Sequence, residues 1–336
     1  MKKILIATAF FLFGSLSWAE GLPLSGFKFR KAVYIQGTEQ DLRDYQVNIK
    51  VGEGEKAGGG ILHCDGLLER DFMDVRWISQ DGRTPLPYYR EFVRGKAPRR
   101  LASFWLKVPR IPAHKKIMIY LYYGNSRADD LSSGKNVFDL FDDFSDGSLN
   151  NRIWKSKIDE GGNLRVANSH LNLSNGEITA RRFDFRQGII EYSAAVEGSG
   201  AIGLVLRKRD VFYSSAYNGA EHCIAIGGIV QANDPSPILF GFRYNYRLIV
   251  DNGAMLFERY NENFEQRQAR VSFSSQEMSL PGWPGNKYAN SKKDNFTIGL
   301  RSIGGESRSS PIYYDWLRVR KYANPGPRVY FRETSK

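Results

Sequence analysis

Carboxylate side chains that stand close together in the sequence are the first candidates for chemistry. Hydrolysis of a glycosidic bond requires two carboxyl groups about 5 to 10 Å apart, one of them with a raised pKa. The near-pairs are Asp142 with Asp143, Asp159 with Glu160, and Glu258 with Glu262. None has the i, i+2 spacing that would put two carboxylates on one face of a strong strand, and Glu191 stands alone in the run 188–196. Because the nucleophile-elbow, zinc-protease and phosphate-loop motifs are also absent, the sequence favours a protein without catalytic activity.

Binding chemistry is better represented, first in the run 240–250. Period-two alternation puts Phe242, Tyr244 and Tyr246 on one face of a strand and Arg243 and Arg247 on the other. In one interpretation the aromatic rings form core and the arginines face water. In the other, the tyrosine or arginine row lies on a concave sheet and stacks on or hydrogen-bonds sugar rings. Tyr244, Tyr246, Arg243 and Arg247 are therefore candidate ligand-binding residues.

A tryptophan in the loop 279–294 is a further candidate. Trp283 is flanked by Pro281 and Pro284, which hold it rigidly in a segment that is not a strand. It can serve as an exposed stacking platform for a sugar, or it can plug the end of its own sandwich.

The charge of the chain points to an anionic partner. The formal net charge is +12, and nine lysines and arginines stand against one acid, Glu91, between Arg90 and Lys116. Arg99 and Arg100 are the candidates at the centre of this basic stretch, although such side chains are often simply solvated. A nucleic-acid partner is not expected, because no nucleic-acid-binding motif is present. Acidic polysaccharide, anionic headgroups or another anionic envelope polymer would use the same positive field.

Cys64 and Cys223 are the two cysteines of the chain. In an oxidising compartment an even count allows one disulfide, which would here join two domains. Both lie in apolar sequence, where a buried thiol is an equally good interpretation. Each follows a histidine, but adjacent residues of a strand point to opposite faces, so a Cys2His2 zinc site is not favoured.

The first nineteen residues read as a secretory signal peptide. Two lysines come first, the apolar run 4–16 follows, and Ser17-Trp18-Ala19 has the small-x-small pattern of a cleavage site. The apolar run is too short for a membrane anchor, and no later segment is apolar enough to span a bilayer. We expect a secreted or periplasmic protein that begins at Glu20.

The elements that must position these residues are strands. With 18 Tyr, 21 Phe and 33 Gly, the composition favours rings and turns, as β-proteins require. Six apolar-alternating runs between residues 27 and 123 predict a first β-sandwich domain over 26–136, and the run 116–123 predicts a strand buried on both faces. About ten more runs between 152 and 322 predict a second domain over 137–323 made of two large stacked sheets. Residues 324–336 are expected to be a tail.

Linked motifs in the first domain resemble one known family. These are the strand Asp71–Trp77, Asp81-Gly82, Pro85–Pro87, Trp105 with Pro109, and Tyr122–Asn125. Over about 29–144 the chain is similar to the bacterial and archaeal domain of unknown function numbered 2341. The resemblance implies a secreted or surface β-sandwich module, often joined to a jelly-roll partner or to membrane subunits resembling proton channels, and it brings no activity.

The second domain is similar to the concanavalin-like jelly rolls, over most of 137–323. The matching pieces are Asp142–Phe144 with Trp154, the run 188–196, and Tyr314–Val319 in the last strand. This group contains laminin-G-like modules, carbohydrate-binding modules and the laminarinase type of glycoside hydrolase. The alternating Glu-x-Asp-x-Glu strand of that hydrolase is absent here, which weakens the case for an enzyme.

The jelly-roll resemblance also raises a structural calcium site, because the two ends of such a domain lie side by side. Asp142 or Asp143 near its first strand and Asp315 in its last could supply the hard oxygen ligands that Ca²⁺ prefers. The alternative is that Asp142 and Asp143 cap a turn while Asp315 accepts hydrogen bonds from backbone amides. No other cofactor is expected.

Together these patterns predict a secreted or periplasmic surface or envelope module that binds polysaccharide or another anionic polymer without catalysis. Two other classes stay open. One is a structural or adhesive envelope component that binds a protein, and the other is a divergent polysaccharide-cleaving enzyme.

Overall fold

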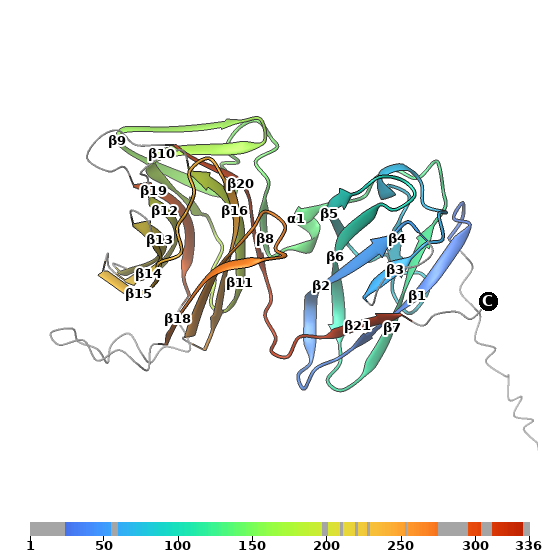
Figure 1. Ribbon diagram of the computed structural model, residues 1–336. Coiled ribbons are helices and arrows are strands. Elements are labelled where there is room, and N and C mark those ends of the chain that lie inside the picture. Colours follow the sequence, from blue (N-terminus) through green and yellow to red (C-terminus); the bar gives the residue numbers. More distant parts are fainter. Residues whose placement is uncertain are drawn as a thin grey trace, which may run out of the picture.

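The chain forms two β-rich units that lie side by side (Figure 1). The computed structural model describes residues 24–54, 60–196, 201–208, 211–218, 221–226, 229–252, 254–274, 295–303 and 311–331. Strands dominate this part of the chain, and the helical elements are one 3-10 turn and one short α-helix. The all-β prediction is therefore confirmed. No helix in the described ranges has the length and apolar character needed to cross a bilayer.

The first unit is a sandwich of two four-stranded sheets, in the orders β21-β1-β7-β4 and β3-β2-β6-β5. Its strands are β1 (Phe29–Gln36), β2 (Leu42–Gly52), β3 (Ile61–His63), β4 (Arg76–Ile78), β5 (Tyr88–Arg94), β6 (Leu101–Ile111), β7 (Lys116–Tyr123) and β21 (Arg328–Phe331). A 3-10 turn, η1 (Arg70–Phe72), precedes β4. Alternate residues of the strands point inward, and the buried side chains of Val33, Val47, Phe104 and Leu121 join one core between the two sheets.

The C-terminal strand β21 corrects the expectation that 324–336 is a tail. Residues 328–331 pair antiparallel with β1, with Val329 opposite Ile35 and Phe331 opposite Val33. Val329 and Phe331 also pack against the core of the first unit. The chain therefore leaves the first unit, builds the second, and returns to cover the edge of β1 (Figure 1).

The second unit is one long antiparallel sheet of thirteen strands that curls over its own core. Its central order is β15-β14-β13-β12-β19-β10-β20-β11-β16-β17-β18, with β8 paired to β20 and β9 to β10. The strands are β8 (Leu140–Asp142), β9 (Trp154–Ala167), β10 (His170–Ala180), β11 (Gly188–Val196), β12 (Ala201–Lys208), β13 (Val211–Asn218), β14 (Glu221–Ile226), β15 (Ile229–Asp234), β16 (Arg243–Asp251), β17 (Ala254–Tyr260), β18 (Arg267–Ser274), β19 (Thr297–Ile303) and β20 (Ile312–Arg320). Contacts of β14 and β15 with β18 bring the two ends of the sheet together, as a jelly-roll sandwich requires.

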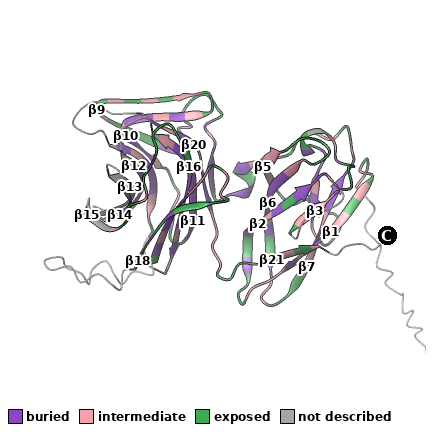
Figure 2. Ribbon diagram, viewed as in Figure 1, coloured by how far each residue is buried: buried purple, intermediate pink, exposed green. Residues whose placement is uncertain are grey.

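The core of the second unit follows the alternation of its central strands. Tyr192 on β11, Tyr246 on β16 and Tyr314 on β20 are buried in one cluster, and the rings of Tyr192 and Tyr246 stack with centroids 4.8 Å apart. The opposite face of these strands carries charged side chains, among them Glu191 and Arg247. Figure 2 shows the contrast with β9, which is mostly exposed or intermediate.

The two units meet at a small aromatic cluster of their own. Trp105, Phe138 and Phe141 are buried there together with Val137, and Tyr89 packs against them. Phe138 and Phe141 flank the turn between α1 (Gly134–Val137) and β8. The connecting segment is hydrogen-bonded to the first unit, since the backbone N–H of Ser133 donates to the carbonyl of Tyr88. The junction is therefore packed rather than a loose linker.

Candidate functional site

A cleft of about 870 Å³ lies between the two units, beside the aromatic junction. The wall from the first unit carries Asn48, Lys50, Tyr89, Glu91, Ser103 and Trp105. The wall from the second unit carries Ser193, Arg243, Asn245, Arg247, Asp315, Trp316 and Arg318, and the turn 262–265 after β17 closes one side. Outward-facing positions of β2 and β6 and of β11, β16 and β20 thus face one another across the cleft.

A β-bulge on each wall delivers a carboxylate to this cleft. In β5 the pairing with β6 shifts between Arg90 and Phe92, which leaves Glu91 as the extra residue. In β20 the pairing with β11 shifts where Asp315 is the extra residue, so Asp315 and Trp316 both line the cleft although they are adjacent in sequence. Bulges of this kind re-aim side chains and are common beside functional sites.

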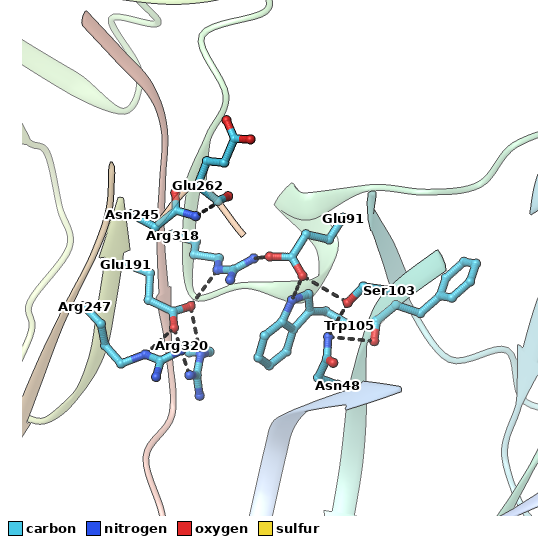
Figure 3. Close-up of polar contacts among 11 residues, drawn as sticks. Asn48, Glu91, Ser103, Trp105, Glu191, Asn245, Arg247, Glu262, Arg318 and Arg320 are labelled. Atoms are coloured by element: carbon cyan, nitrogen blue, oxygen red, sulfur yellow. Dashed lines mark hydrogen bonds and ion pairs between the residues drawn. The ribbon is translucent and has the colours of Figure 1, made fainter. Parts of the chain in front are cut away.

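Arg318 connects the two units across the base of the cleft (Figure 3). Its Nη1 donates to Oε1 of Glu91 in the first unit at 2.6 Å, and its Nε donates to Oε2 of Glu191 in the second at 2.7 Å. The other oxygen of Glu91 accepts hydrogen bonds from Trp105 Nε1 and Ser103 Oγ, both at 3.0 Å. The guanidinium also lies over the rings of Trp105 and Trp316, at 4.9 and 4.8 Å from their centroids, a favourable cation–π arrangement.

Glu191 is the centre of charge on the second wall. Its side chain is 0% exposed, and it accepts hydrogen bonds from Arg247 at 2.7 Å, Arg318 at 2.7 Å and Arg320 at 3.0 Å. Burial alone would raise the pKa of this carboxyl, but the guanidinium groups of Arg320, Arg318 and Arg247 hold the pKa of Glu191 well below its usual range. Glu191 is therefore a permanent anion at neutral pH and cannot act as a proton donor there.

Asp315 lies at the other end of the second wall and behaves differently. Its carboxylate contacts Arg243 Nε at 2.7 Å and His170 Nε2 at 2.9 Å, and Ser193 Oγ donates to it at 3.4 Å. Burial raises the pKa of Asp315, while the nearby Arg243 and His170 side chains oppose that rise. This carboxyl anchors the Arg243 side chain, which is 43% exposed.

The structure divides the residues predicted from the run 240–250. Tyr244 and Tyr246 are 5% and 1% exposed and belong to the core of the second unit, so the prediction that they contact a ligand is wrong. Arg243 and Arg247 line the cleft, as one of the two interpretations expected. Trp283 lies outside the described residues.

Four of the nine basic residues in the stretch 90–116 pair with acids elsewhere in the described part of the fold. Arg100 donates from Nη2 to Oε1 of the buried Glu53 at 2.6 Å, and Arg90 and Arg110 pair with Asp130 and Asp41. The guanidinium of Arg100 is therefore paired inside the protein, although Arg100 lines a pocket together with Arg99, and an anionic partner for these two arginines stays a prediction. Arg99 is exposed and lines a separate pocket of about 700 Å³ next to His63.

The three aspartates proposed for calcium are each held by protein donors. Asp142 accepts hydrogen bonds from Trp154 Nε1 at 2.7 Å and from the Phe144 backbone at 2.9 Å. Asp143 accepts a hydrogen bond from Ser145 Oγ at 2.6 Å, and Asp315 is paired as described above. Within the described ranges no group of three or more His, Cys, Asp or Glu residues is placed to hold a metal ion.

Cys64 and Cys223 are not joined by a disulfide. Cys64 is 0% exposed in the core of the first unit, whereas Cys223 is 1% exposed on β14 of the second. Burial raises the pKa of the Cys64 thiol, which makes it unreactive. The sequence left an interdomain disulfide and buried thiols open, and the structure shows two buried thiols, one in each unit.

Several residues of the cleft were not predicted from sequence. Glu91 and Asp315 reach it through bulges, and period-two alternation gives no sign of a bulge. Trp105 and Trp316 occur in the motifs that carried the family resemblances, but nothing in either motif says that one guanidinium group, that of Arg318, lies over both rings. Phe264 lies in the turn after β17, with its ring centroid 6.1 Å from that of Trp316.

Solved structures of similar shape cover about half of the chain or slightly more. A beta-1,3-glucanase from Mycobacterium marinum is 15% identical and has a TM-score of 0.40, over 54% of this chain and 98% of that one. An immunostimulatory antigen and pseudo beta-1,3-glucanase of Mycobacterium tuberculosis is 16% identical and has a TM-score of 0.42, over 57% of this chain and 100% of that one. A GH43 protein from Bacillus licheniformis is 13% identical and has a TM-score of 0.41, over 62% of this chain and 47% of that one. At these scores nothing about activity or ligand transfers to this chain.

No curated protein matches the chain in sequence. One family model does, that of the Domain of unknown function (DUF2341), over residues 71–157. This match begins and ends later than the resemblance over 29–144, and the shared part, 71–144, contains β4 to β8 and the wall of the cleft formed by β5 and β6. In this part of the chain, the protein is similar to that family.

Proposed function

We propose that this protein is a non-catalytic, secreted or periplasmic surface or envelope module that binds polysaccharide in the cleft between its two units. The observation that carries the proposal is the composition of the cleft. Aromatic rings, amides, guanidinium groups and carboxylates converge from both units on a volume of about 870 Å³, which is the size of small-ligand sites.

This mixture of groups suits a sugar chain. The C–H faces of a sugar ring pack on aromatic rings, and Trp316 and Phe264 lie together on the second wall. Sugar hydroxyls need both donors and acceptors, which the guanidinium group of Arg243 and the amide oxygen of Asn48 can supply. An apolar peptide segment would leave many of these polar groups without partners.

The carboxylates of the cleft support binding rather than hydrolysis. A glycosidase needs one protonated acid and one carboxylate that is open to the substrate. Glu191 is 0% exposed and held by three arginines, and Glu91 is held by Arg318, Trp105 and Ser103. The pKa of Asp315 is raised, as a catalytic general acid requires, but its oxygens contact Arg243 and His170 rather than facing a substrate.

The test is retention of the whole mature chain on a panel of immobilised polysaccharides. Trp316→Ala and Phe264→Ala should each weaken binding about tenfold, because each removes a stacking surface. Tyr330→Ala is the matched control, since Tyr330 is 37% exposed on β21 and does not line the cleft. Retention by no polysaccharide, or an equal loss in all three variants, would contradict the proposal. Reducing ends released from a retained polymer would contradict its non-catalytic part.

A further inference from the structure

The outward face of the second unit carries more guanidinium groups than carboxylates. On β11, β16 and β20 this face forms a wall of the cleft, and β17 and β18 continue it. Among the described residues, six arginines of this face share three carboxylates of the same face and Glu91 of the first unit: Arg243, Arg247, Arg267, Arg270, Arg318 and Arg320 with Glu191, Glu258, Asp315 and Glu91. The remaining charged residues of the cleft offset one another, because Arg94 pairs with Glu265, and Lys50 and Glu262 have opposite charges. The outward face of the second unit therefore keeps a positive surplus, most of it on Arg267, Arg270 and Arg320 beyond the cleft lining. Among the residues that line the cleft itself, five basic side chains stand against four carboxylates.

Two of these arginines are held in a way that leaves hydrogen-bond donors for a ligand. Nε of Arg243 contacts Asp315 at 2.7 Å, and Nε of Arg247 contacts Glu191 at 2.7 Å. The planar guanidinium has five N–H donors in a fixed fork, so an anchor at Nε also fixes the direction of the Nη groups. Within the described residues no hydrogen bond is made by Nη1 of Arg243 or Nη2 of Arg247. The side chains are 43% and 23% exposed.

The spacing of the two arginines indicates a chain-like ligand. Arg243 and Arg247 are four residues apart on β16, which separates them by about 13 Å along the strand. Asn245 lies between them on the same wall. A ligand that meets both guanidinium groups must extend over more than one sugar ring.

We propose that the cleft selects acidic polysaccharides, and that Arg243 and Arg247 bind the anionic groups of separate sugar units. The groups are uronate carboxylates or sulfate esters, which both match the guanidinium fork. This inference rests on the proposed function and adds the substrate class. Because each guanidinium is already oriented by a carboxylate, little side-chain entropy is lost when the ligand binds.

The experiment compares polymers that differ only in charge. Polygalacturonate and its fully methyl-esterified form share one backbone, and dextran sulfate and dextran form a second pair. The mature protein should bind the acidic member of at least one pair at least tenfold more tightly than the neutral member. The pair that shows the difference distinguishes carboxylate from sulfate recognition. High salt should weaken the acidic complex and leave any neutral complex nearly unchanged.

Arginine variants locate the effect. Arg243→Gln and Arg247→Gln should each weaken acidic-polymer binding about tenfold, and Arg243→Lys should lose less because the charge is retained. Arg165→Gln is the matched control, because Arg165 is exposed on β9 and does not line the cleft. Circular dichroism and an unfolding curve establish whether each variant is folded. If Arg247→Gln does not fold, the Arg243 variants alone decide the result, because Arg243 is the more exposed of the two side chains.

Each outcome bears on one proposal or on both. Equal binding of the two members of each pair, or an equal loss in Arg165→Gln, overturns the charge selectivity while polysaccharide binding survives. Binding to neither member of either pair, and to nothing on the wider panel, overturns both.

Discussion

Replacing Glu191 by Gln removes the negative charge on which three guanidinium groups converge while keeping the shape of the side chain. Glu191 is 0% exposed, and the shortest hydrogen bonds that it accepts from Arg247, Arg318 and Arg320 are 2.7, 2.7 and 3.0 Å long. The amide of Gln cannot accept from all three and carries no charge. The variant therefore leaves several buried positive charges around a neutral group.

The expected loss in free energy of unfolding follows from the partners that remain. Breaking a buried ion pair by removing one member costs about 3 to 5 kcal/mol. Arg318 keeps Glu91 at 2.6 Å, and Arg247 keeps Tyr260 at 3.2 Å with Glu258 at 3.9 Å, whereas Arg320 shows no second carboxylate among the described residues. We expect a loss of about 4 kcal/mol for Glu191→Gln at neutral pH.

Urea unfolding followed by tryptophan fluorescence measures this loss, because the chain has 6 Trp and two of them contact Arg318. Glu265→Gln is the matched control: its carboxylate is 63% exposed and pairs with Arg94, so its loss should stay below about 1 kcal/mol. A difference of less than about 1 kcal/mol between the two variants would refute the idea that Glu191 is the buried centre of the network.

The pH dependence gives an independent check on the same residue. The pKa of Glu191 is held below its ordinary value of 4.5, so the unfolded state binds the proton first as the solution is acidified. The stability that ionised Glu191 contributes is fully present above pH 4.5 and disappears as the pH falls through the lower, folded-state pKa. The gap in stability between the wild type and Glu191→Gln should therefore narrow below pH 4.5. A gap that stays constant would contradict the assigned direction of the pKa shift.

Two further predictions concern the second unit and the metal question. Burial lowers the pKa of His222 from 6.5 to about 4, so the free energy of unfolding should fall by roughly 3 kcal/mol as the pH falls from 6.5 to 4. In urea unfolding measured over this pH range, His222→Phe should make the free energy of unfolding depend less on pH. An unchanged pH dependence would contradict the prediction. EDTA should leave the melting temperature unchanged, because the oxygens of Asp142 and Asp315 are already bound by protein groups; a melting temperature that falls and is restored by Ca²⁺ would instead establish a calcium site.

The strands with a strong local pattern were predictable from the sequence. The run 188–196 coincides with β11, and the run 116–123 is β7, which lies between β1 and β4 in its sheet. Short strands without alternation were missed. β8 has three buried residues in a row, and β21 has four residues whose role depends on pairing with β1, almost 300 residues earlier.

The candidate site was much less predictable, for a physical reason. The alternation in 243–247 separated arginines from tyrosines correctly, but it could not say which row meets a ligand. That choice depends on the first unit, which places Trp105 and Glu91 opposite Arg318. A cleft formed between two units, with a bulge in each wall, depends on contacts far apart in the chain and leaves no local pattern to read.

The pairing of β21 with β1 has a consequence for the order in which the chain can assemble during synthesis. The first unit occupies both ends of the described sequence, and the whole second unit is inserted between β7 and β21. One sheet of the first unit therefore lacks its edge strand, β21, until residue 331 has left the ribosome. By that time every strand of the second unit is available to fold. Until then the backbone of β1 is an unprotected edge. Strand β21 thus completes the unit that β1 began, and two covalent connections, rather than one, then join the walls of the cleft.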